Sequence, residues 1–121
     1  MKYAEITGWG SYVPPVRMTN DDMSQVIDTN DEWIFSRSGI KQRHYSHVST
    51  GKMAWLACER ALDAAGVNAE DVDLIILGST SPEEICPNTA SYIKNELGAT
   101  KAAAFDLNSA CTSWFYGVNV A

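Results

Sequence analysis

The sequence predicts an α/β protein with a mainly parallel sheet. Strand-type segments alternate with helix-type segments, which is the order that builds parallel sheets with right-handed crossovers. Two short runs, residues 74–77 and 102–107, are apolar enough for strands covered on both faces. The second run leads into residues 111–121, which are small or apolar and almost uncharged, so this helix is expected to be buried nearly all round.

The first half of the chain predicts one strand, two short helices and an extended segment. Residues 3–13 form the strand, which Pro14 and Pro15 stop, and Gly8 and Gly10 indicate a closely packed neighbour. A helix over residues 21–27 follows a cap at Thr19 or Asn20. A second helix over residues 31–37 follows a cap at Thr29 or Asn30 and ends at Gly39, before an extended segment over residues 40–45.

The second half predicts two longer helices around the strand at residues 74–77. The first runs from Ser49 or Thr50 to Ala65, and the second runs over residues 87–97 and ends at Gly98. Small residues dominate one face of the first helix, which implies close packing against another element. These residues are Ala54, Ala57, Cys58, Ala61, Leu62 and Ala65.

Composition limits the class of protein. A chain of 121 residues is one domain or part of one, and its net charge of −6 argues against non-specific nucleic-acid binding. There is no apolar run of membrane-spanning length and no signal-type N-terminus, so we expect a cytoplasmic location and no membrane partner. Three widely spaced cysteines form neither a disulfide framework nor a zinc pattern.

The charge is unevenly distributed, because no acidic residue lies between Glu32 and Glu59. That interval contains Arg37, Lys41, Arg43, His44, His47 and Lys52. A basic surface there suits a phosphate-bearing ligand or an acidic partner protein, and a solvated basic face without a ligand remains the alternative. The two histidines have a metal-type spacing, but no carboxylate is near them, so no metal site is predicted.

Cys111 is the candidate nucleophile. Asn108 and Ser109 end the preceding strand and can open a helix, which places Cys111 in the first helical turn. Unpaired backbone N–H groups and the helix dipole favour a thiolate there, as in a nucleophile elbow. The alternative is that Cys111 is a small, buried and inert hydrophobic residue.

Four stretches resemble the thiolase-like condensing enzymes, and most closely β-ketoacyl-acyl-carrier-protein synthase III. They are residues 6–14, 28–40, 74–87 and 105–111. The second contains Asp-Glu-Trp-Ile, two variable residues and then Arg-Ser-Gly-Ile, and the fourth matches the run into the family's nucleophile. The resemblance covers essentially the whole chain and implies the N-terminal half of a thiolase-like, layered α-β-α-β-α fold.

The resemblance implies an acyltransferase that initiates fatty acid synthesis. Cys111 would take an acyl group from acyl-CoA as a thioester, and malonyl-acyl-carrier protein would then decarboxylate and condense with it. The Cys111 backbone N–H would serve as one oxyanion donor. The implied partners are acyl-CoA, malonyl-acyl-carrier protein and a second copy of the chain in a homodimer, with no cofactor beyond the acyl-CoA substrate.

The resemblance also implies the substrate-binding residues. Trp33 and Arg37 would hold the CoA adenine between them, with Thr29 and Ser38 nearby. From the residues alone, the favoured interpretation of Trp33 is a helix residue packed on the core. The acyl pocket would involve Thr80, Ser81 and Cys86.

The chain departs from the family pattern at two places and stops before two catalytic residues. The family usually has Ala-Gly-Phe or Ser-Gly-Phe after the nucleophile, where this chain has Thr112, Ser113 and Trp114, and Cys86 replaces a common phenylalanine. The family's catalytic His and Asn lie beyond Ala121. We therefore expect residues 1–121 to be one piece of a condensing domain and inactive alone. A condensing enzyme of secondary metabolism or of long-chain acyl condensation, and a non-catalytic CoA- or carrier-binding fragment, remain the alternatives.

Overall fold

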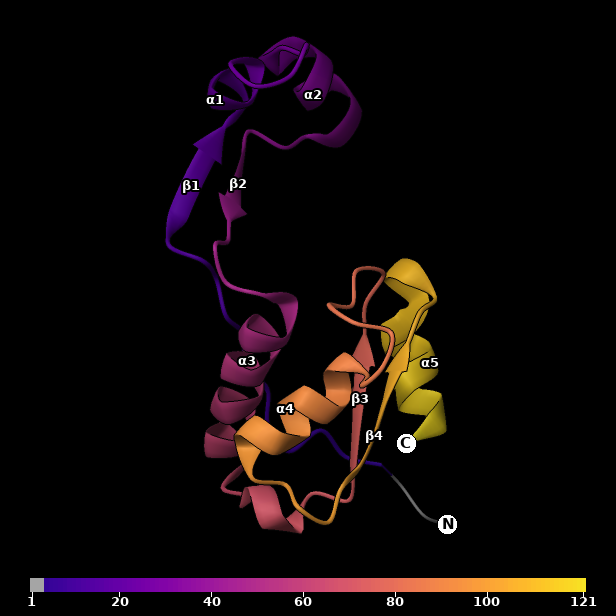
Figure 1. The fold of residues 1–121 in the computed structure, drawn as a ribbon. Coiled ribbons are helices and arrows are strands. Elements are labelled where there is room, and N and C mark those ends of the chain that lie inside the picture. The colour runs from indigo at the N-terminus through magenta and orange to yellow at the C-terminus, as the bar shows by residue number, and fades with distance from the viewer. Residues whose placement is uncertain (1–3) are drawn as a thin grey trace. The chain divides into compact units, whose positions relative to one another are not determined.

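The computed structural model describes residues 4–121, which divide into two compact units. The larger unit contains residues 4–12 and 48–121, and the smaller unit is Val13–His47. Along the chain the elements are β1 (Val16–Thr19), α1 (Asn20–Ser24), α2 (Asp31–Ser38), β2 (Gln42–Tyr45), α3 (Thr50–Ala65), η1 (Ala69–Asp71), β3 (Leu74–Gly78), α4 (Thr89–Leu97), β4 (Ala103–Leu107), η2 (Ala110–Thr112) and α5 (Ser113–Val120) (Figure 1).

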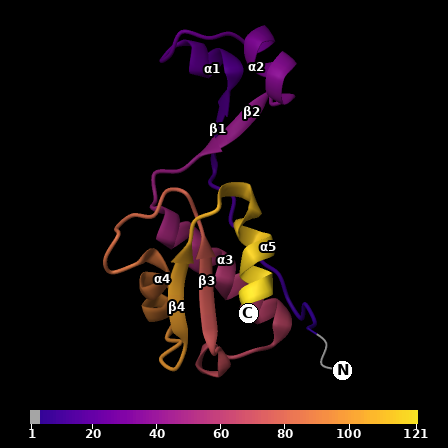
Figure 2. The same cartoon turned by 90° about the vertical axis from the view of Figure 1, so that its right-hand side faces the viewer.

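The larger unit is a helix–sheet–helix sandwich. Strands β3 and β4 pair in parallel, with Leu74 opposite Ala103 and Gly78 opposite Leu107. Helix α4 packs on one face of this pair and against α3, while α5 lies on the other face (Figure 2). The parallel pair and the helices around it confirm the α/β class that the alternating segments predict.

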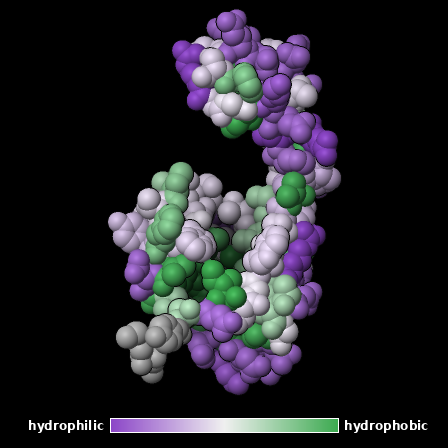
Figure 3. Space-filling view, turned by 180° about the vertical axis from the view of Figure 1, so that it is seen from behind, coloured by the Kyte–Doolittle hydropathy of each residue, from purple (hydrophilic) through white to green (hydrophobic). Residues whose placement is uncertain are grey.

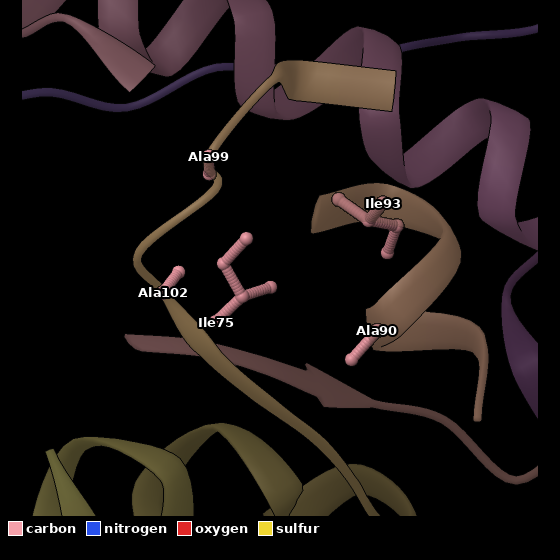
Figure 4. Close-up of a cluster of buried hydrophobic side chains, with 5 residues drawn as sticks. All are labelled: Ile75, Ala90, Ile93, Ala99 and Ala102. Atoms are coloured by element: carbon pink, nitrogen blue, oxygen red, sulfur yellow. The ribbon is translucent and has the colours of Figure 1, made fainter. Parts of the chain in front are cut away.

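A small apolar core joins the sheet to α4. Five buried side chains meet there, and they belong to β3, α4 and the turn between α4 and β4 (Figure 4). They are Ile75, Ala90, Ile93, Ala99 and Ala102. Most of them are alanines, so α4 lies close to the sheet.

The predicted strand over residues 3–13 is wrong for the described residues 4–13, which form no strand; residue 3 lies outside the described part. A strand needs a hydrogen-bonded neighbour, and this segment runs along α3 instead. A Cβ on Gly8 would lie 2.5 Å from the Ala61 carbonyl oxygen, and one on Gly10 would overlap the Ala57 carbonyl. The close neighbour that the two glycines predict is therefore confirmed, and it is the small-residue face of α3.

The smaller unit contains an antiparallel pair, so the sheet content is not mainly parallel throughout. Val16 of β1 lies opposite Tyr45 of β2, and Thr19 lies opposite Gln42. The predicted helix over residues 21–27 is shorter than expected, because α1 ends at Ser24. Helix α2 matches its prediction, with the Asn30 side chain accepting the Trp33 N–H and Gly39 in the left-handed conformation at the end.

Helix α5 is not buried nearly all round in the described chain. The exposed fractions of Trp114, Phe115 and Tyr116 are 60%, 65% and 57%. The composition of α5 is apolar on every side, but among the described elements it packs chiefly against β3 and η2. Apolar side chains consequently gather on the surface of the larger unit, around a hollow (Figure 3).

None of the described helices has both the length and the apolar character needed to span a membrane.

Candidate active site

The turn that carries Cys111 is a tight strand-to-helix connection. Strand β4 ends at Leu107, and Ala110 has a φ of 50°, a left-handed conformation that is strained for a residue with a side chain. Cys111 is the middle residue of η2 and is exposed. The first turn of α5 therefore begins two residues after Cys111, at Ser113, and not at the cysteine itself. This corrects the predicted position, although the elbow-like turn is present.

Two hydroxyl groups hold this turn. The Ser113 Oγ accepts the Ser109 N–H at 3.0 Å and donates to the Leu107 carbonyl at 3.3 Å. The Thr112 Oγ1 donates to the Ser109 carbonyl at 2.6 Å. These bonds connect the end of β4 to the start of α5 and fix the backbone on both sides of Cys111.

Gly78 makes room for the side chain of Ser113, one of the departures from the family pattern. The Ser113 side chain is 4% exposed and points at β3, where Gly78 leaves room for it. A Cβ on Gly78 would lie 2.7 Å from the Ser113 Cβ, which is closer than two carbons can approach. The missing side chain at Gly78 therefore accommodates a serine at a position where the family usually has glycine.

Asp106 anchors the strand that leads to Cys111. Its two carboxylate oxygens accept the backbone N–H groups of Thr89, at 3.0 Å, and Ala90, at 2.8 Å. These N–H groups lie in the first turn of α4, where helices lack internal partners and favour a negative charge. The Asn88 side chain adds a bond to the Ala104 carbonyl at 3.3 Å. Strand β4 is thus tied to α4 on the side away from α5.

The environments of the cysteines differ. Burial raises the pKa of the Cys58 thiol on α3, because a thiolate there would lose its hydration. Cys111 is exposed and lies immediately before the N-terminus of α5, the positive end of the helix dipole. The arrangement therefore favours nucleophilic chemistry at Cys111 and disfavours it at Cys58.

The predicted acyl-pocket residues share the larger unit with Cys111. Thr80, Ser81 and Cys86 are all exposed and belong to the segment between β3 and α4. A cavity of ≈ 370 Å³ lies between β3 and α5, beside the Cys111 turn. Its lining includes Leu74, Ile76, Gly78, Ser113 and Trp114. The predicted pocket residues and Cys111 do not line this cavity.

In the smaller unit, Trp33 and Arg37 lie against each other. The Arg37 guanidinium carbon is 4.5 Å from the centre of the Trp33 ring, and Nη1 donates to the Trp33 carbonyl at 3.4 Å. The two side chains are too close to hold a flat ring between them in this structure, because such a ring needs a separation of about 7 Å, twice a normal contact distance. Trp33 is also 54% exposed, so it is not the core residue that the alternative predicted.

Thr29 and Trp33 border a common cavity. It has a volume of ≈ 380 Å³ and is lined by Ile27, Asp28, Thr29, Asn30 and Trp33. The Thr29 Oγ1 is buried and has no hydrogen-bond partner among the described residues. Such a group is costly to bury unless a partner reaches it. Ser38 behaves differently, because its hydroxyl donates to the Ile34 carbonyl at 2.7 Å and accepts the Ile40 N–H at 3.1 Å, which completes the end of α2.

The basic interval is partly structural. The Arg43 guanidinium donates to the Met18 carbonyl at 3.2 Å, the Thr19 carbonyl at 3.0 Å and the Asn20 Oδ1 at 2.5 Å. Asn20 is 1% exposed and also donates to Asp31. Arg43 is therefore committed to the packing of the smaller unit.

Within residues 4–121, no three His, Cys, Asp or Glu side chains come together in a way that could hold a metal ion.

Sequence reasoning missed Gly78, Ser113 and Asp106 as residues that build the site. Ser113 appeared only as a departure from a motif, and its partner Gly78 is 35 positions away along the chain. The Asp106 carboxylate accepts hydrogen bonds from residues that lie 16 and 17 positions earlier in the sequence. The acidic residue inside an otherwise apolar strand was the one local signal, since a carboxylate there needs donors.

The comparisons with known proteins agree with this architecture. The fold is that of the thiolase-like enzymes: the β-ketoacyl-acyl-carrier-protein synthase III of Aquifex aeolicus matches with a TM-score of 0.89 at 37% identity, over 96% of this chain and 38% of that one. The priming β-ketosynthase of a polyketide pathway matches with a TM-score of 0.90 at 32% identity, over 97% of this chain and 36% of that one.

A curated relative gives the more specific likeness. β-Ketoacyl-acyl-carrier-protein synthase III 2 of Vibrio cholerae is 51% identical over 119 residues, which are 98% of this chain and 33% of the relative. No protein-family model matches the chain. The chain is therefore similar to the synthase III enzymes over the part that it matches, and it spans about a third of their length.

Proposed function

We propose that this chain forms part of a synthase III-type condensing enzyme, with Cys111 as the acyl-accepting nucleophile. The observation that supports this most is the strained strand-to-helix turn at residues 108–112, in a chain with 51% identity to a curated synthase III. The term complete synthase means here a protein of the full length of such relatives that contains this chain. We infer a homodimeric cytoplasmic enzyme that meets acyl-CoA and malonyl-acyl-carrier protein.

The proposed reaction has two steps. The Cys111 thiolate attacks the carbonyl carbon of an acyl-CoA, the carbon–sulfur bond to CoA breaks, and CoA leaves as a thiolate that takes a proton. The malonyl group of the carrier protein then loses CO₂, and the resulting carbanion attacks the acyl-enzyme carbonyl. The bond to Cys111 breaks, the β-ketoacyl product stays on the carrier, and the thiolate is restored. The Cys111 N–H contributes to the oxyanion site in both steps.

The proposed CoA site uses the smaller unit. Thr29 Oγ1 is buried without a partner among the described residues, beside a cavity that Trp33 also lines, and this gives a polar group and an aromatic face for one ligand. Because Arg37 stacks directly on Trp33, the guanidinium would move outward to let an adenine enter between it and the indole, where both side chains contact the ligand. Ser38 contributes by closing α2 rather than by contacting the ligand.

Replacing either stacking residue tests the CoA site. In the complete synthase, Trp33→Ala and Arg37→Ala should each reduce kcat/KM for acyl-CoA by a factor that corresponds to about 1–3 kcal/mol, as for bases stacked on aromatic residues. The step with malonyl-acyl-carrier protein should change less. Unchanged acyl-CoA kinetics in both variants would contradict this role.

A second candidate is a condensing enzyme of a specialised pathway. The likeness to a polyketide-priming ketosynthase, at 32% identity, favours it, as do Cys86 and the Thr112–Trp114 departure. Steady-state rates with acetyl-CoA and with longer acyl-CoAs decide between the two. A preference for acetyl-CoA supports initiation of fatty acid synthesis, and a preference for a longer or branched acyl group supports the specialised role.

A further inference from the structure

We propose that Glu83 is a positioning residue that holds the segment of residues 79–88 on the body of the larger unit, and so determines which acyl group is accepted. We call this segment the pocket loop; it carries Thr80, Ser81 and Cys86. The consequence for acyl selection rests on the proposed function, because that function makes these three residues part of the acyl pocket.

The first observation is the contact of the Glu83 side chain with α3. Its Oε1 accepts the Gly51 N–H at 2.5 Å, in the first turn of that helix. The helix N-terminus has unpaired N–H groups and a partial positive charge, so a carboxylate stabilises it better than a neutral group does.

The second observation is that the space around this contact is shaped for the carboxylate. Gly51 is buried, and a Cβ there would lie 2.7 Å from the Glu83 Oε1 and 2.7 Å from the Tyr92 Cδ1. The carboxylate also contributes to raising the pKa of Tyr92, after burial and Glu96, which agrees with their proximity. The side chain of Glu83 thus occupies a defined place between α3 and α4, although the residue belongs to an exposed loop.

The third observation is a chain of bonds from Glu83 to the strand of the nucleophile. The Glu83 N–H donates to the Thr89 Oγ1 at 3.2 Å, and the Thr89 N–H donates to the Asp106 Oδ2 at 3.0 Å. Thr89 is 3% exposed. Asp106 lies on β4, five positions before Cys111. The pocket loop and the Cys111 strand are therefore fixed to the same residue of α4.

Glu83 is the anchored residue in the middle of the loop, whose ends are held by the Ser79 N–H on the Leu107 carbonyl at 3.2 Å and the Asn88 side chain on the Ala104 carbonyl at 3.3 Å. Glu84 is exposed and makes no hydrogen bond or ion pair with a described residue, and Ile85 is 93% exposed. Among the described residues, Ser81 bonds within the loop, from its N–H to the Ser79 Oγ at 3.1 Å. When the Glu83 carboxylate is removed, the loop keeps the bonds at its two ends and the backbone bond to Thr89, and its middle loses the hydrogen bond to α3.

The experiment compares Glu83→Ala, Glu83→Gln and Glu84→Ala in the complete synthase. Hydrogen–deuterium exchange of the loop amides and of the Gly51 amide measures how firmly the loop is held. Values of KM and kcat for a short and a long acyl-CoA measure selection. Glu83→Gln keeps an oxygen acceptor without the charge, and Glu84→Ala removes a carboxylate one residue away that has no such contact.

We expect Glu83→Ala to speed exchange at Gly51 and in the loop by about tenfold, as for loss of one hydrogen bond to a charged group. The ratio of the two KM values should change by about threefold or more, with kcat within about twofold, since Glu83 does not touch the reacting atoms. Glu83→Gln should recover most of the wild-type exchange rate and of the wild-type KM ratio, and Glu84→Ala should match the wild type in both.

Equal exchange in Glu83→Ala and Glu84→Ala would overturn the proposed hold on the loop. Faster exchange with an unchanged ratio of KM values would overturn the role in acyl selection. A wild-type synthase that accepts no acyl group would instead contradict the proposed function, and the exchange data would still decide whether Glu83 holds the loop.

Discussion

At the scale of single residues, the cysteines are distinguished by their surroundings. Cys58 lies on the packed face of α3, where burial raises the pKa of its thiol, while Cys86 and Cys111 are exposed. Cys111 alone lies in a strained turn just before a helix N-terminus. Reactivity should therefore follow local structure and not exposure alone.

Alkylation of the complete synthase with iodoacetamide near neutral pH should modify Cys111 first. Because the pKa of Cys58 is raised above its ordinary value, its thiolate fraction at a given pH is lower, and its labelling should become fast only at higher pH than that of an exposed cysteine. Peptide mapping over a pH series measures the order. Labelling of Cys58 or Cys86 before Cys111 would contradict the assignment.

Gly78 and Ser113 make a second residue-scale test. Gly78→Ala places a methyl group on the Ser113 side chain and should lower the free energy of unfolding by about 1–3 kcal/mol, as overpacking does. Adding Ser113→Gly removes the obstructing Cβ, so the double variant should recover part of that loss despite losing the Ser113 hydrogen bonds. Urea denaturation of the single and double variants measures the coupling, and simple additivity of the two effects would argue against this contact.

At the scale of elements, Asp106 connects β4 to α4. In Asp106→Asn, the amide oxygen can accept only one of the Thr89 and Ala90 N–H groups, and the amide NH₂ faces the other N–H group without accepting from it. The free energy of unfolding should fall by about 1–3 kcal/mol, the cost of an unsatisfied partly buried group. Asp63→Asn, at an exposed position on α3, is the matched control. Equal midpoints of urea denaturation for the two variants would show that the Asp106 bonds do not stabilise the fold.

The elements also show what the sequence alone can predict. Helices α2, α3 and α4 were predicted closely because caps at Asn30, Ser49 and Asn88 and glycines after each helix are local signals. The strand expected at residues 3–13 failed because a strand requires a partner that local composition does not reveal. Within the site, Cys111 was predicted from its local pattern, whereas the contact of Glu83 with Gly51 spans 32 positions and has no such signal.

At the scale of the whole molecule, the two units carry different parts of the proposed reaction. The larger unit holds Cys111 and the pocket loop, and the smaller unit holds the Trp33 and Thr29 cavity. The exposed apolar side chains of α5 and the hollow beside β3 belong to the larger unit (Figure 3). Because the chain spans about a third of its relatives, activity is best tested in the complete synthase.

The most direct measurement of the central claim is the mass of the acylated protein. The complete synthase is incubated with acyl-CoA in the absence of malonyl-acyl-carrier protein, digested under conditions that preserve thioesters, and mapped by mass spectrometry. The account predicts one acyl group per chain, on Cys111, and no acylation in Cys111→Ala. Acylation that persists in Cys111→Ala, or that maps to Cys86 or Cys58, would contradict it.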